Sequence, residues 1–210
     1  MPAPQTHAHD GELVVFHIGM TIRKAHRPDL WLPVVRAMPR MLTELARNTE
    51  AAARGEAEDL GFLGATTLVG ARGPWVVQYW RSVDHLYAYA RAADHAQLPA
   101  WRAFNRVARR HPGAVGIWHE TYAVPAGGVE TLYVGGAGTG LAAATGAVPA
   151  TRRGTDARER LTSGPLPAPV APAPAERRPV LCALVAPGGR PARTVSGVAG
   201  SRWTVRGSGP

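Results

Sequence analysis

The chain has 210 residues and 45% hydrophobic content, which allows one folded domain with a tail or two small domains. Its net charge of +9 indicates general attraction to polyanions, but no recognised nucleic-acid motif accompanies it, so we expect no specific nucleic-acid partner. A stretch without charges, residues 131–151, is dominated by Gly and Ala and is broken by a proline, so we expect no membrane span.

Composition divides the chain into three parts. Residues 1–10 lack a structural pattern, and we expect a disordered N-terminus. Residues 162–210 are rich in Pro, Gly, Ala and Arg and poor in large apolar side chains, which predicts a disordered tail. The folded domain is then residues 11–161, long enough to bury a core. The single cysteine, Cys182, and the lack of a recognisable signal peptide favour a cytoplasmic protein.

The first half of the domain begins with a strand over residues 12–22, whose one face is apolar and whose other face holds His17. A helical pattern follows in "RPDLWLPVVRAMPRMLTELARN", with a kink or break expected at Pro39. Residues 60–70 and 74–81 are rich in β-branched and aromatic side chains and flank the turn "ARG". They predict a β-hairpin.

Two helical patterns follow the hairpin, one capped by Ser82 and one beginning at Pro99. Strands are then predicted over residues 114–124 and 130–136. This order is the split βαβ pattern of ferredoxin-like α+β folds, an antiparallel sheet with helices on one face. Because the other face carries apolar and aromatic side chains, we expect a homodimer in which two sheets pack face to face.

Five short segments carry a resemblance to a known family: "VVFHIGM", "WLPVVRAMPRM", "QYWRSVDHLYAYA", "LPAWRAFN" and "VGIWHETY". In this order, over residues 14–161, they resemble the fumagillin-pathway monooxygenase-like family, formerly a domain of unknown function. That family is similar to the antibiotic-biosynthesis monooxygenases. The resemblance implies a dimeric α+β barrel with monooxygenase-like activity, without a cofactor, on an electron-rich small molecule of secondary metabolism. Three departures are His17, where we expect an aliphatic residue, two extra residues after His95, and "YVGGAGTGL", which replaces a usual Asn-Met-Pro after Tyr-Val.

The segment "GIWHETY" contains the candidate base. Strand alternation places His119 and Glu120 on opposite faces of the sheet. His119 suits a general base because its unperturbed pKa lies near neutrality; the plainer alternative is a buried histidine bonded to a neighbouring strand. Arg81 is the candidate partner for a carboxylate or enolate. Its plainer alternative is an ion pair at the end of a strand.

Five aromatic or amide side chains are candidates for the wall of the substrate pocket. They are Trp80, Tyr89, Trp101, Asn105 and Trp118. Trp101 and Asn105 lie four apart on a predicted helix and share a face, and the resemblance implies that such a pair holds an activated substrate near O₂. The plainer alternative makes Trp101 part of the core.

Two other functions remain open at this point. Dimeric α+β barrels also house haem, and His17, His85 and His119 are candidate axial ligands of a dehydratase- or peroxidase-like protein. The other is a non-catalytic module that binds small molecules or polyanions through its basic tail. The eight histidines show no zinc-type spacing. The sequence "GTGLAA" lacks the βαβ context of a dinucleotide site.

Overall fold

The computed structural model describes residues 2–92 and 97–166, without the side chains of residues 97–100 and 103. A four-stranded sheet organises these residues. Its strands are β2 (Leu13–Ile22), β3 (Phe62–Gly70), β4 (Gly73–Trp80) and β5 (Val115–Val124). They lie in the order β3-β4-β2-β5, and each neighbouring pair is antiparallel.

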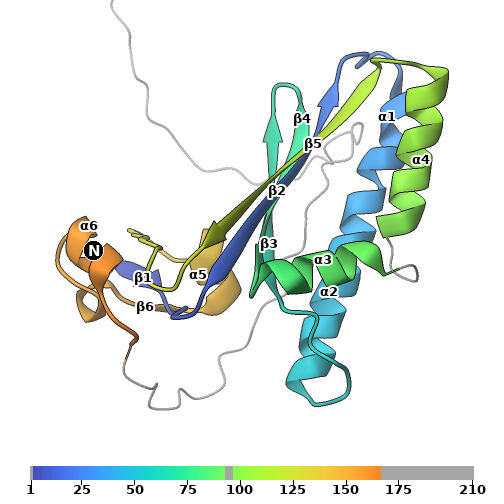
Figure 1. Ribbon diagram of the computed structural model, residues 1–210. Helices are drawn as coiled ribbons and strands as arrows, with labels where there is room; N and C mark the ends of the chain where they lie inside the picture. The colour runs from blue at the N-terminus through green and yellow to red at the C-terminus, as the bar shows by residue number, and fades with distance from the viewer. Residues whose placement is uncertain (1, 93–96, 167–210) are drawn as a thin grey trace, which may run out of the picture. The chain divides into compact units, whose positions relative to one another are not determined.

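Two pairs of helices connect the strands. The first pair, α1 (Pro28–Val35) and α2 (Ala37–Ala53), joins β2 to β3, and the second, α3 (Val83–Arg91) and α4 (Gln97–Arg110), joins β4 to β5. All four helices lie on one side of the sheet (Figure 1). This connectivity and strand order are those of a ferredoxin-like fold, so the predicted α+β class is confirmed.

Alternate side chains of β2 point toward the helices and anchor two separate apolar clusters. Val14 belongs to a cluster with Trp80 and the side chains of α2 and α3, whereas Met20 belongs to a cluster with Leu30 and Val115. Burial of each large apolar side chain stabilises the fold by about 1.5–3 kcal/mol. The first cluster therefore holds α2 and α3 near one end of β2, and the second holds α1 and α4 near the other end.

The helical segment between β2 and β3 breaks as predicted, but earlier than Pro39. α1 ends at Val35, α2 begins at Ala37, and the backbone N–H of Arg36 between them still donates to Leu32. Pro39 lies in the first turn of α2, where a missing backbone donor costs nothing because it has no partner within the helix.

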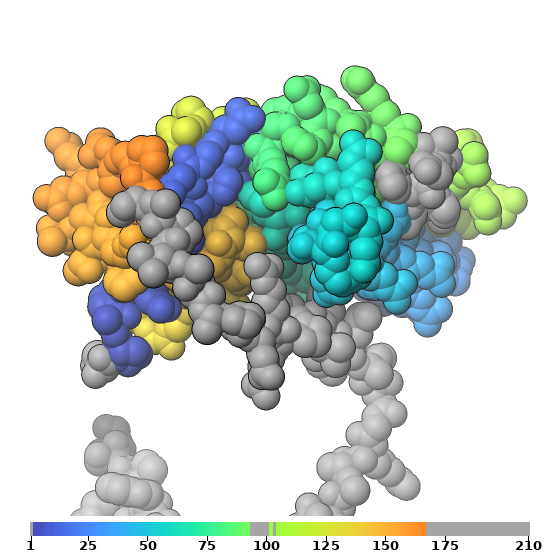
Figure 2. Space-filling model, turned by 90° about the horizontal axis from the view of Figure 1, so that it is seen from below, coloured from blue at the N-terminus to red at the C-terminus, as the bar shows by residue number. Residues whose placement is uncertain are grey.

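The face of the sheet away from the helices, here called the outer face, is covered at one end. There α5 (Gly140–Thr145) packs against β3, where Ala144 lies so close to Gly64 that a Cβ on this glycine would come within 2.7 Å of it. Figure 2 shows this part of the chain, in ochre, next to strand residues in teal. Elsewhere the outer face carries Trp75 and Trp118, which flank Gly19 in the strand pairing.

The chain ends of the described part form a second, two-stranded sheet. Its strands are β1 (Gln5–His7) and β6 (Ala147–Pro149), followed by the short 3₁₀ helix η1 (Ala150–Arg152) and by α6 (Ala157–Thr162). We call residues 4–12 and 146–166 the annex. The strand expected over residues 130–136 is absent among the described residues, where Tyr133 makes one isolated bridge to Gln5.

The annex differs from the expectation for the N-terminus. Residues 1–10 were expected to be disordered, but Gln5–His7 pairs with β6, and the side chains of Thr6 and His7 are buried. The division into residues 11–161 and a tail over 162–210 stays a prediction, because residues 167–210 lie outside the described residues. His95, noted above as a departure from the family pattern, also lies outside them. Among the described residues, no helix has both the length and the apolar character that crossing a membrane requires.

Candidate functional site

The predicted base and anion partner lie apart. His119 pairs with Ile18 across the sheet, which places it on the helix side, and its exposed ring lies 5.7 Å from that of Phe16. It is therefore not the buried histidine of the plainer alternative. Arg81 is exposed at the end of β4, and its Nη2 lies 2.8 Å from the Asp59 carboxylate, as the plainer ion-pair alternative expects.

The predicted pocket wall is dispersed over both sides of the sheet. Trp80 is 0% exposed and its ring lies 5.6 Å from that of Tyr89, whose hydroxyl pKa is raised by burial. Trp101 is 53% exposed, so it is not core, and half-buried Asn105 lies on the same helix. Trp118 points to the outer face, opposite to His119. The catalytic and binding roles of these residues stay predictions.

The outer face has a cavity of about 490 Å³ between the sheet and the segment that follows β5. We call it the outer hollow. Six apolar side chains line it: Leu13, Val15, Val77, Val124, Val129 and Leu141. Its polar lining residues include His17, Tyr79, Glu130, Thr131 and Tyr133. The cavity therefore combines an apolar body with an imidazole and two phenols, a composition typical of small-molecule sites.

The strand register explains how these groups come together. Val15 pairs with Tyr79 and His17 pairs with Val77, so the imidazole and the phenol lie diagonally on one face of neighbouring strands. The half-buried His17 ring contacts the edge of Tyr122 at 5.7 Å between ring centres and makes no hydrogen bond with the described residues. It is therefore available to a ligand.

Each of the two phenols of the outer hollow has a hydroxyl that can donate a hydrogen bond to a ligand. Burial, with a smaller effect from Tyr133, raises the pKa of Tyr79 above its ordinary value, so its hydroxyl keeps the proton. The Tyr133 hydroxyl accepts a hydrogen bond from the backbone N–H of Ala142 at 3.2 Å, which leaves its own proton to donate. Glu130 lies 2.8 Å from Arg160, so this cation neutralises the carboxylate.

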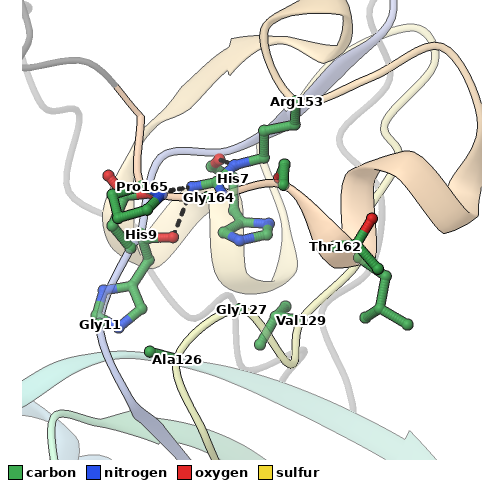
Figure 3. A pocket seen from close by; sticks show the side chains of 13 residues that line it. His7, His9, Gly11, Ala126, Gly127, Val129, Arg153, Thr162, Gly164 and Pro165 are labelled. Carbon is green, nitrogen blue, oxygen red and sulfur yellow. Dashed lines mark hydrogen bonds and ion pairs between the residues drawn. The ribbon is translucent and has the colours of Figure 1, made fainter.

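The annex holds a second cavity of about 380 Å³ (Figure 3). The side chain of Arg153 is 4% exposed and lies in the wall of this cavity. It donates hydrogen bonds to the carbonyl oxygens of His7 and His9, at 3.1 and 2.7 Å, and to the Asp10 carboxylate at 2.7 Å. Nδ1 of His7 lies 3.0 Å from the Thr131 hydroxyl. These polar groups satisfy one another, which indicates a structural role for the network.

The histidines proposed as haem ligands have different surroundings. His85 is hydrogen-bonded through Nδ1 to the Ser82 hydroxyl at 2.7 Å, and its ring lies against Gly61 so closely that a Cβ there would overlap it. His17 and His119 have accessible rings on opposite faces of the sheet. In the described part of the chain, no group of three or more His, Cys, Asp or Glu side chains is placed to hold a metal ion.

Comparisons with known proteins give one family. The family model described as Monooxygenase af470-like matches residues 13–141. Monooxygenase af470 of Aspergillus fumigatus is 29% identical over 129 residues, which cover 59% of this chain and 43% of the fungal protein. This chain thus spans less than half the length of that curated relative.

Solved structures show weaker likenesses. One is SnoaB, a cofactor-independent oxygenase from Streptomyces nogalater, with 15% identity and a TM-score of 0.36 over 53% of this chain and 91% of SnoaB. Another is the aldoxime dehydratase OxdRE in complex with butyraldoxime, with 15% identity and a TM-score of 0.45 over 58% of this chain and 34% of that protein. The strand order β3-β4-β2-β5 by itself identifies the ferredoxin-like fold.

The matched range distinguishes the two cavities. Every residue that lines the outer hollow lies between Leu13 and Leu141, within the family match, whereas most of the annex cavity comes from residues outside it. Sequence reasoning missed the outer hollow, although strand alternation already places His17 and Tyr79 on one face. No feature of the sequence indicated that Tyr133 lines a cavity, because residues 130–136 were expected to form a strand of the sheet.

Proposed function

The chain belongs to the monooxygenase af470-like family, and from this membership we propose that it is a monooxygenase without a bound cofactor. Its substrate is an electron-rich small molecule of secondary metabolism. The observation that carries the proposal is the outer hollow, where an accessible imidazole lies among apolar side chains within the family-matched residues. A base in an apolar cavity is what such chemistry requires of a protein.

The proposed reaction starts with proton abstraction from an activated carbon. The base takes a proton from a CH₂ group that is bonded to a carbonyl carbon or to an aromatic ring carrying a hydroxyl. The resulting carbanion or enolate then passes electrons to O₂. A carbon–oxygen bond forms, and loss of water from the peroxide leaves a carbonyl. One oxygen atom enters the product and the other leaves as water, so the substrate itself supplies all the electrons.

We assign the base to His17, on the outer face, rather than to His119. His119 was favoured by the sequence and is accessible, but neither of the two cavities described above includes it. Arg81, the predicted anion partner, is already paired with Asp59. A sheet histidine at the wall of an apolar cavity is the better placed of the two to meet a substrate proton.

The test measures O₂ consumption by the full chain with a panel of hydroxylated, enolisable aromatic compounds. His17→Ala is expected to lower kcat by about 10²–10⁴-fold, the usual contribution of a general base, with an unchanged thermal midpoint. His119→Ala is the matched control and should retain activity. Loss of activity in His119→Ala but not in His17→Ala would assign the base to His119, on the helix side of the sheet. A wild-type chain that oxygenates none of the panel would contradict the proposed function.

We also propose the homodimer that the sequence favours. The part of the outer face beyond α5 carries Trp75 and Trp118, and a second sheet packed there would close the open side of the hollow against water. Light scattering at micromolar concentration is expected to give twice the chain mass. Trp118→Glu, which puts a charge on that face, should shift the protein to monomer, and a wild-type monomer would sink the proposal.

A further inference from the structure

The hydroxyls of Tyr79 and Tyr133 lie close together although their residues are far apart in the sequence. Tyr79 is on β4, and Tyr133 follows β5. Both hydroxyl oxygens lie near the point where a Cβ would sit on Gly140, at 3.7 and 3.1 Å. Gly140 has a φ of 61°, a left-handed conformation that glycine adopts without strain, and it places no side chain beside the two hydroxyls.

Both hydroxyls can donate to a ligand. Tyr133 already accepts from the backbone N–H of Ala142, so its remaining strong interaction is donation. The Tyr79 hydroxyl makes no hydrogen bond with the described residues, and the raised pKa of this side chain keeps it protonated. Two O–H groups at one end of an apolar cavity resemble the donor pairs that stabilise a developing oxyanion.

The charges around the outer hollow restrict the chemistry of that oxygen. Neither Lys nor Arg is among its lining residues in the described chain, and Glu130 is paired with Arg160. A carboxylate or phosphate carries a full charge at neutral pH and is normally held by a cation. An enol or phenol enters neutral and needs no fixed cation. Negative charge develops on its oxygen only as the substrate loses a proton, and hydroxyl donors can stabilise that charge.

We propose that Tyr79 and Tyr133 form the oxygen-binding end of the outer hollow and that its ligand is a phenol or enol with a flat apolar body. The body lies along Val15 and Val77 on the floor of the cavity. This inference rests on the proposed function for the reaction that follows binding. It adds the substrate class and the two residues that select it.

The test is equilibrium binding of 4-nitrophenol to the full chain, without turnover. Its phenolate absorbs visible light and its phenol does not, so the spectrum reports both binding and the pKa of the bound hydroxyl. We expect that pKa to fall on binding. Tyr79→Phe and Tyr133→Phe should each weaken binding of the phenolate by about 10–100-fold, the value of a hydrogen bond to a charged oxygen.

Two controls isolate the donor pair. Tyr87→Phe makes the same change at an exposed tyrosine of α3 and should leave binding unaltered. Benzoate, a carboxylate of similar size, should bind the wild-type chain at least about tenfold more weakly, a difference of roughly 1.4 kcal/mol. The pKa of bound 4-nitrophenol needs no variant and remains decisive if either Phe substitution lowers stability.

Four results would overturn the inference. They are unchanged affinity in both Phe variants, equal affinity for benzoate, a pKa of 4-nitrophenol that does not fall on binding, and displacement of 4-nitrophenol as the chain self-associates. The last result would assign the hollow to a second copy. Tyrosine-dependent binding without oxygenation of any compound would uphold the inference and contradict the proposed function. Oxygenation that depends on His17, without phenol binding, would do the reverse.

Discussion

Replacing Trp80 with alanine is expected to lower the free energy of unfolding by about 3–5 kcal/mol, the usual cost of truncating a buried aromatic side chain. The ring is 0% exposed and lies between Phe62 and Tyr89, with ring centres 5.3 and 5.6 Å away. Its Nε1–H donates to the side-chain oxygen of Gln78 at 3.0 Å, and Gln78 is itself buried. The substitution therefore leaves a cavity and an unsatisfied amide. Urea unfolding measures the loss.

Trp101→Ala is the matched control, since both tryptophans were predicted to line a substrate pocket. The Trp101 side chain is 53% exposed, and we expect its removal to cost less than about 1 kcal/mol. A Trp80 variant as stable as the wild type, yet unable to bind substrate, would contradict the core assignment and restore the role expected from the sequence.

Lowering the pH from about 7.5 to 4.5 is expected to destabilise the annex through His7. Burial, followed by the nearby charge of Arg153, lowers the pKa of His7 from 6.5 to about 4. Between these values the unfolded chain binds a proton that the folded chain does not, so stability is full above pH 6.5 and falls as the pH drops toward 4. The loss from this group is about 2–3 kcal/mol.

The comparison variant is His7→Gln, which can keep the hydrogen bond to Thr131 but does not titrate. Its stability should depend less on pH over this interval, while the carboxylates of the chain contribute equally to both proteins. Hydrogen exchange at the amides of β1 and β6 follows the annex itself. Parallel pH profiles for wild type and variant would show that His7 is not buried in its neutral form.

The fold was predictable because its determinants are local. Alternation in β2 and β5 fixes which side chains face the helices, and Pro39 indicates a break in the first helical segment even though the break falls at Arg36. The split βαβ order then leaves few topologies. The same alternation correctly separated His119 from Glu120, whose carboxylate accepts a hydrogen bond from Tyr122 on the outer face.

The candidate site was less predictable because its parts meet only through tertiary contacts. Tyr133 reaches Gly140 and Ala142 through an irregular segment that has no periodicity. Trp80 and Tyr89 share the aromatic character of a pocket wall, and only packing against Phe62 shows that they are core. At Arg81 the sequence left an anion partner and an ion pair open, and it could not name Asp59, because the two residues meet only in the folded chain.

The pairing of β1 with β6 ties the first residues of the described chain to those that follow α5. Trimming the protein to the family-matched range 13–141 would remove both strands, and with them Arg153 and the His7 carbonyl that it contacts. Thr131 would lose its buried neighbours and Glu130 its cation, both on the rim of the outer hollow. A shortened version of this protein can therefore remain soluble and still have an altered outer hollow, so ligand binding has to be measured as well as solubility.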